Sequence, residues 1–128
     1  MIQSSPIYAA ILGLIFFFLS LRVVRLRQSQ RIIIGTKGNE ALERAIRVHG
    51  NFSEYVPLTL LLLLMLELKS ANFLLVNTLG IMLLAGRCIH AWGVSQEKED
   101  FRFRSIGMVT TFLTIVIASI SLIVLSVL

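Results

Sequence analysis

Residues 46–66 read IRVHGNFSEYVPLTLLLLLML, and this stretch decides the fold. Its uncharged part, residues 55–66, is too short to cross a membrane, because a spanning helix needs about 20 mostly apolar residues. A complete crossing must therefore begin near Ile46. The polar residues that such a crossing carries into or against the membrane are Arg47, His49, Asn51 and Glu54. Charged side chains at that depth normally face protein or a watery cavity, so the stretch predicts a polar site inside a membrane protein.

Three further apolar runs are each long enough, or nearly so, to cross about 30 Å of hydrocarbon. The chain has 128 residues and is 56% hydrophobic, more apolar surface than a soluble fold of this size could bury. We therefore predict a single domain over residues 1–128, an all-α membrane protein built as a four-transmembrane-helix bundle. The predicted spans are residues 7–24, 46–66, 71–92 and 105–128.

The basic residues predict how the helices are oriented. All but Lys69 lie around the first and third connections. By the positive-inside rule these two connections face the cytoplasm and both termini face away from it. This distribution explains the excess of 12 Lys and Arg over 7 Asp and Glu, so we expect no nucleic-acid partner. The first apolar run is not a cleavable signal, because its basic residues follow it.

One face of the second span is polar. At about 100° per residue, Arg44, Arg47, Asn51 and Glu54 fall on one narrow stripe, and His49 points to nearly the opposite side. Two interpretations stay open: a buried ion pair of Glu54 with an arginine, or a ligand site. Two arginines, an amide and a carboxylate exceed what one ion pair needs. They suit a small ligand with carboxylates, amides and an ammonium group, about the size of a tripeptide.

Other polar residues converge on the same leaflet. Arg87 and His90 lie on one face near the cytoplasmic end of the third span, and we expect Arg104 and Ser105 in the first turn of the fourth. Snorkelling to lipid headgroups explains Arg22, Arg27, Arg31 and Arg102. Asn39 is expected to cap the second helix, and residues 67–70 to form the turn into the third. We interpret Cys88 as a packing residue and predict no metal site.

Residues 43–57, ERAIRVHGNFSEYVP, resemble the signature of the MAPEG family, the membrane-associated proteins in eicosanoid and glutathione metabolism. The spacing Arg-x-x-x-Asn-x-x-Glu-x-x-Pro from Arg47 to Pro57 is specific. Support comes from VRLR at 24–27, GRCIH at 86–90 and Arg104-Ser105. The resemblance covers essentially the whole chain and is closest to the small bacterial members, which implies the bacterial inner membrane.

The resemblance further implies a homotrimer that holds glutathione between adjacent subunits on the cytoplasmic side. The glutathione-binding residues would be Arg47, Asn51, Glu54 and Tyr55, with Arg25 from the neighbouring subunit and Arg87 and His90 nearby. The catalytic residues would be Arg104, which stabilises the thiolate, and Ser105, which assists. A guanidinium favours thiolate formation because its positive charge stabilises the anion. A lipophilic electrophile could reach the sulfur from the bilayer.

One position departs from the family pattern. Family enzymes often carry a tyrosine one turn after the histidine of the third span, and here that position is Val94. Any hydroxyl donor to the sulfur is therefore lost there. Two function classes stay open: a glutathione transferase or peroxidase of lipophilic electrophiles, suited to detoxification, and a non-catalytic membrane protein that binds lipid or presents it to a partner.

Overall fold

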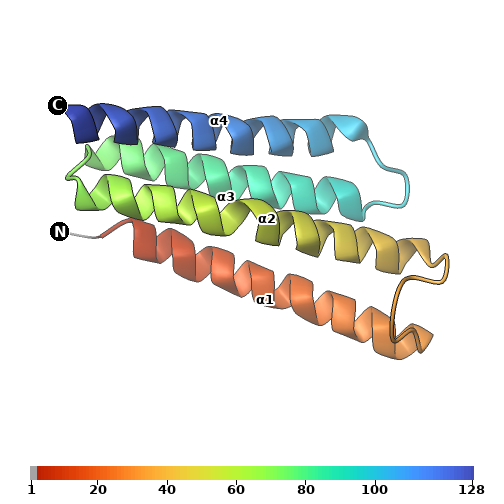
Figure 1. Ribbon diagram of the computed structural model, residues 1–128. Coiled ribbons are helices and arrows are strands. Elements are labelled where there is room, and N and C mark those ends of the chain that lie inside the picture. The colour runs from red at the N-terminus through yellow and green to blue at the C-terminus, as the bar shows by residue number, and fades with distance from the viewer. Residues whose placement is uncertain (1–2) are drawn as a thin grey trace.

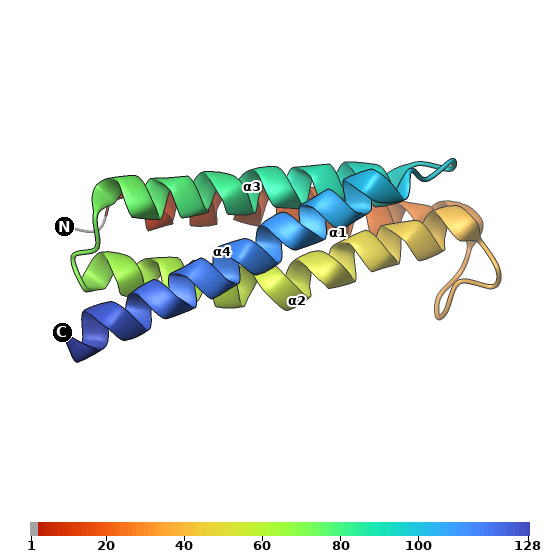
Figure 2. The same ribbon diagram turned by 90° about the horizontal axis from the view of Figure 1, so that it is seen from above.

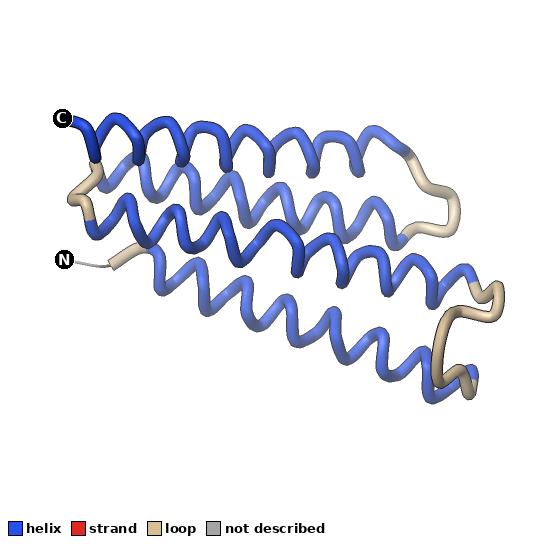
Figure 3. The backbone as a smooth tube through the Cα atoms, in the orientation of Figure 1, coloured by secondary structure: helices blue, strands red, loops and turns tan. Residues whose placement is uncertain are grey.

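Four long helices run side by side in the computed structural model, which describes residues 3–128 (Figure 1). They are α1 (Ser5–Gln30), α2 (Glu40–Leu68), α3 (Phe73–Ser95) and α4 (Phe101–Val127). All regular structure within the described residues is helical (Figure 3). Each helix is long and apolar enough to cross a membrane. The prediction of an all-α chain with four potential spans is thus confirmed, and both termini lie at the same end of the bundle (Figure 1).

The helices extend beyond the apolar runs, and α4 begins earlier than predicted. The helix α4 begins at Phe101, because the Asp100 side chain accepts a hydrogen bond from the backbone N–H of Arg102 at 2.9 Å and caps the helix there. Arg104 is the fourth residue of the helix and completes its first turn as expected, whereas the expectation is wrong for Ser105, which begins the second turn. The expected turn at residues 67–70 is confirmed: the backbone N–H of Ser70 donates to the carbonyl of Glu67 at 3.0 Å, directly where α2 ends at Leu68.

The start of α2 agrees with the sequence. Asn39 Oδ1 accepts a hydrogen bond from the backbone N–H of Leu42 at 2.9 Å, which confirms it as the N-cap. The connection from α1 to α2 is shaped by Arg31, Gly35, Lys37 and Gly38, all of which have positive φ. The Arg27 guanidinium holds this connection by donating to the carbonyl of Gly35 at 3.0 Å.

The first turn of α1 is capped by a side chain from another helix. The Glu67 carboxylate, near the end of α2, accepts hydrogen bonds from the backbone N–H groups of Gln3, Ser4 and Ser5 at 2.9, 2.6 and 3.0 Å. It also accepts from the hydroxyl of Ser5 at 2.5 Å. A carboxylate suits the positive end of a helix dipole, so this clasp ties α1 to α2 at the end of the bundle that holds the termini.

Glycines allow α3 and α4 to approach closely. A Cβ at Gly107 would lie 2.6 Å from the Cβ of His90 and 2.7 Å from the carbonyl oxygen of Gly86, too close for real atoms. A Cβ at Gly93 would lie 2.8 Å from the Cβ of Phe103. Small residues at such contacts are typical of helix packing in membranes. The two helices are closest near the connection between them, which the sequence predicts to face the cytoplasm. From there α4 crosses obliquely over the bundle (Figure 2).

Candidate functional site

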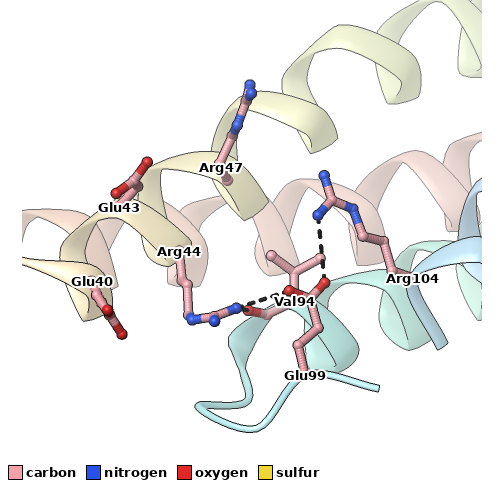
Figure 4. Close-up of a pocket in the computed structure, with 7 residues that line it drawn as sticks. All are labelled: Glu40, Glu43, Arg44, Arg47, Val94, Glu99 and Arg104. Atoms are coloured by element: carbon pink, nitrogen blue, oxygen red, sulfur yellow. Dashed lines mark hydrogen bonds and ion pairs between the residues drawn. The ribbon is translucent and has the colours of Figure 1, made fainter. Parts of the chain in front are cut away.

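Two adjoining clefts open beside the α3–α4 connection. One encloses about 390 Å³ and the other about 340 Å³. Both are lined by Arg47, Val94 and Arg104, so they share a wall. The first adds the α2 side chains Glu40, Glu43 and Arg44 and the connection residue Glu99 (Figure 4). The second adds Ile46, Gly50, Asn51, Glu54 and His90.

The polar stripe of α2 faces these clefts. Arg47 and Glu54 are exposed, and Asn51 is half-buried. Among residues 3–128 the two ion pairs both involve Glu99, so Glu54 is not paired with Arg47 in this structure. His49 lies on the other side of α2, where its Nε2 is 3.0 Å from the hydroxyl of Ser20 on α1. The helical wheel therefore separates cleft residues from packing residues correctly.

Arg87 lies inside the bundle rather than on the cleft wall. Its side chain is fully buried at 1% exposure. The guanidinium donates to Asn51 Oδ1 at 2.6 Å and to the carbonyl oxygen of Gly107 at 3.2 Å. Arg87 thus links α2, α3 and α4. Because arginine can only donate, the amide oxygen of Asn51 must face it, and the amide NH2 is the group left to meet a ligand.

Tyr55 and His90 support the same region. The Tyr55 ring packs edge-on against Phe112 of α4, with centroids 5.5 Å apart, and lies 5.8 Å from the guanidinium carbon of Arg87. His90 is buried, packs against Gly107 and lines the second cleft. His90 therefore contributes to the wall of the site as well as to the packing of α4, whereas Tyr55 lines neither cleft and contacts Phe112 and Arg87.

Glu99 is a site residue that the sequence did not single out. Its side chain is only 12% exposed, and its carboxylate lies between two arginines (Figure 4). Arg44 donates to Oε2 at 3.0 Å, and Arg104 lies 3.5 Å from Oε1. Arg44 also donates to the carbonyl of Val94 at 3.3 Å. In the sequence, Glu99 lies in the charged run EKED, and nothing there separates it from Glu97. The surplus of arginines on the stripe was the only available signal.

Four of the predicted site residues line neither cleft: Tyr55 and Arg87, described above, and Arg25 and Ser105. Arg25 is exposed on α1 and lines a separate cleft with Phe18, Arg22 and Ala41. Ser105 is exposed on α4, next to Arg104 in sequence but outside the lining of both clefts. A single chain thus gathers Arg47, Asn51, Glu54 and Arg104 around one space, supported by Tyr55, Arg87 and His90.

Comparisons with known proteins place nearly the whole chain in a family. The model of the MAPEG family matches residues 5–124. The chain is also similar to the inner membrane protein YecN of Escherichia coli strain K12, with 40% identity over 108 residues, which cover 84% of this chain and 81% of that protein. The YecN protein of strain CFT073 matches to the same extent. No solved structure matches the chain.

Proposed function

Because the chain belongs to the MAPEG family, we propose that it is a glutathione-dependent transferase or peroxidase of the inner membrane that acts on lipophilic electrophiles. The observation that carries this proposal is the shared wall of the two clefts, where Arg47 and Arg104 face one space together with Asn51 and Glu54. Cations, an amide donor and a carboxylate match the carboxylates, amides and ammonium group of glutathione.

Each side chain has a distinct task in this proposal. The exposed Arg47 binds a ligand carboxylate, and Glu54 binds the ammonium group. Asn51 donates its NH2 to a ligand carbonyl, because Arg87 occupies its oxygen. Glutathione would supply a thiol as nucleophile. Arg104 favours the ionised form of that thiol, since a guanidinium close to a thiolate stabilises its negative charge.

A homotrimer is part of the proposal. Arg25 lies on α1, outside the two clefts that Arg47 and Arg104 line, and its role in binding glutathione therefore requires a neighbouring copy. The large apolar side chains exposed on α1 include Leu14, Phe17 and Phe18, at 62%, 54% and 65% exposure. Such a surface is compatible with lipid or with another subunit in the membrane. Chemical cross-linking of the purified protein tests this part separately, and a monomeric protein would remove Arg25 from the site.

The proposal is tested by titrating the purified protein in detergent with glutathione. Heat of binding measures the affinity, and ultraviolet absorbance of the thiolate measures ionisation. S-methylglutathione is the matched control, because it keeps the carboxylates and the ammonium group but has no thiol. We expect both compounds to bind and only glutathione to give the thiolate signal. If neither compound binds, the assignment to glutathione is wrong.

A non-catalytic role is the second candidate, and Val94 is the observation that favours it. The Val94 side chain is buried at 4% exposure and lines both clefts, so an apolar group lies where many family enzymes carry a tyrosine. This role predicts that glutathione or lipid binds without a thiolate signal. The change Val94→Tyr should then create or strengthen that signal, whereas an active enzyme shows it already.

A further inference from the structure

The Glu99 carboxylate lies where a bound anion would meet Arg44 and Arg104. It is held between α2 and α4, although it belongs to neither helix (Figure 4). The connection that carries it, residues 96–100, is fixed at both ends. Gln96 donates to the carbonyl of Trp92 at 3.1 Å, and Asp100 caps α4. Glu99 is therefore placed by fixed neighbours rather than by chance contact of an exposed side chain.

The carboxylate is poorly satisfied for a buried anion. Oε2 receives a hydrogen bond from Arg44, but no residue within 3–128 donates one to the buried Oε1, which has only the 3.5 Å ion contact with Arg104. Buried carboxylates normally receive several hydrogen bonds. Moving the Glu99 carboxylate out of its place therefore breaks few favourable interactions. Arg44 keeps its bond to the carbonyl of Val94, which holds the guanidinium in place without Glu99.

We propose that Glu99 is a positioning and specificity-determining residue, a resident counter-ion that an incoming ligand anion displaces from Arg44 and Arg104. The inference rests on the proposed function only for the identity of that anion. In the free protein Glu99 keeps the two like charges ordered, because their mutual repulsion is offset. A ligand that brings an anion binds by exchange with Glu99. A neutral ligand leaves Glu99 in place and gains nothing from either arginine.

The same geometry limits thiolate formation. While Glu99 contacts Arg104, that guanidinium already has a negative partner, and a thiolate beside it also meets the repulsion of Glu99. Losing one unit charge about 6 Å from a bound monovalent anion, at an effective dielectric constant of about 40, should raise the affinity for that anion about tenfold, and the affinity for a divalent anion about a hundredfold. Glu99 thus sets how strongly Arg104 can act on a ligand sulfur.

The test is titration of the purified protein in detergent with inorganic sulfate at constant ionic strength. The rise in the midpoint temperature of unfolding at each sulfate concentration measures sulfate binding. Because sulfate is divalent, we expect Glu99→Gln to bind it about a hundredfold more tightly than the unchanged protein. The matched control is Glu97→Gln, which removes the same charge from an exposed position two residues away. It should bind sulfate like the unchanged protein. Loss of a purely structural contact would weaken binding, so the gain in affinity is diagnostic.

Equal sulfate affinity in Glu99→Gln and Glu97→Gln, or no binding by either, would overturn the inference. A second measurement needs no variant: sulfate should speed amide hydrogen exchange in residues 96–100, and slower or unchanged exchange at saturation contradicts displacement. If Glu99→Gln binds sulfate more tightly as expected but the protein does not bind glutathione, the proposed function is wrong and this inference stands. If the protein binds glutathione but Glu99→Gln changes neither glutathione affinity nor sulfate affinity, this inference is wrong and the proposed function stands.

Discussion

The hydrogen bond between Arg87 and Asn51 makes a quantitative prediction about stability. We consider Asn51→Leu, Arg87→Met and the double variant. Asn51→Leu leaves a fully buried guanidinium without its closest acceptor, which should cost about 2–3 kcal/mol. Arg87→Met should cost less, about 1 kcal/mol or under. The reason is that Asn51 is half-buried on a cleft, where water can replace the lost donor.

The double variant should be close to the unchanged protein, within about 1 kcal/mol, because replacing a buried polar pair by apolar groups of similar volume is often nearly neutral. The two substitutions should then show a coupling of about 1.5–3 kcal/mol. The assay is equilibrium unfolding in mixed micelles with increasing denaturing detergent, followed by far-ultraviolet circular dichroism. Fluorescence of Trp92, the single tryptophan, reports the same transition through its contact with Phe103 at 4.9 Å.

The order of the two single variants is the sharper part of this prediction. It follows only from the burial of Arg87 and the cleft position of Asn51. A coupling below about 0.5 kcal/mol would show that the 2.6 Å hydrogen bond has little energetic weight in detergent. Equal costs for the two single variants would refute the reasoning about water access. A control variant, Ser53→Ala, changes an exposed polar residue of the same helix and should shift stability by less than about 0.5 kcal/mol.

Four further predictions concern the site and the fold. Arg104→Ala should lower turnover and the thiolate signal, whereas Arg47→Ala should mainly weaken glutathione binding, so that added glutathione restores part of the rate; the reverse pattern would exchange their roles. Glu54→Gln should weaken glutathione binding while the fold persists, and unchanged affinity would remove it from the site. Reporters fused to the carboxy terminus should report the non-cytoplasmic side and reporters within residues 31–39 the cytoplasm, with the opposite result overturning the orientation. Glu67→Gln should speed amide exchange in the first turn of α1 and lower stability by about 1–3 kcal/mol, whereas unchanged exchange would mean that the cap contributes little.

Local signals in the sequence predicted the helices and the polar stripe. The apolar runs identified all four helices, and the N-cap at Asn39 followed from its place before the acidic residues Glu40 and Glu43. The helical wheel placed Arg47 and Glu54 on the cleft face and His49 on the packing face. These features depend on neighbours within one or two turns, which a single sequence contains.

Contacts between helices were not predictable in the same way. That Arg87 donates to Asn51 depends on the rotation of α3 against α2, which glycine contacts with α4 help to fix. The position of Glu99 depends on where α4 begins, and the apolar run gave no sign that the helix starts at Phe101. The sequence therefore predicted which side chains belong to the polar site better than it predicted how they pair.

The clasp at Glu67 has a consequence for how the protein is made. Its donors, the backbone N–H groups of Ser4 and Ser5, leave the ribosome 63 and 62 residues before the carboxylate that receives them. The first helix must therefore enter the membrane with the leading end of its backbone uncapped. The clasp closes only after the second helix has carried Glu67 across the bilayer to the same side. The clasp can therefore form only when α1 and α2 cross the membrane in opposite directions. Its formation links correct insertion of this helical hairpin to its first folding step.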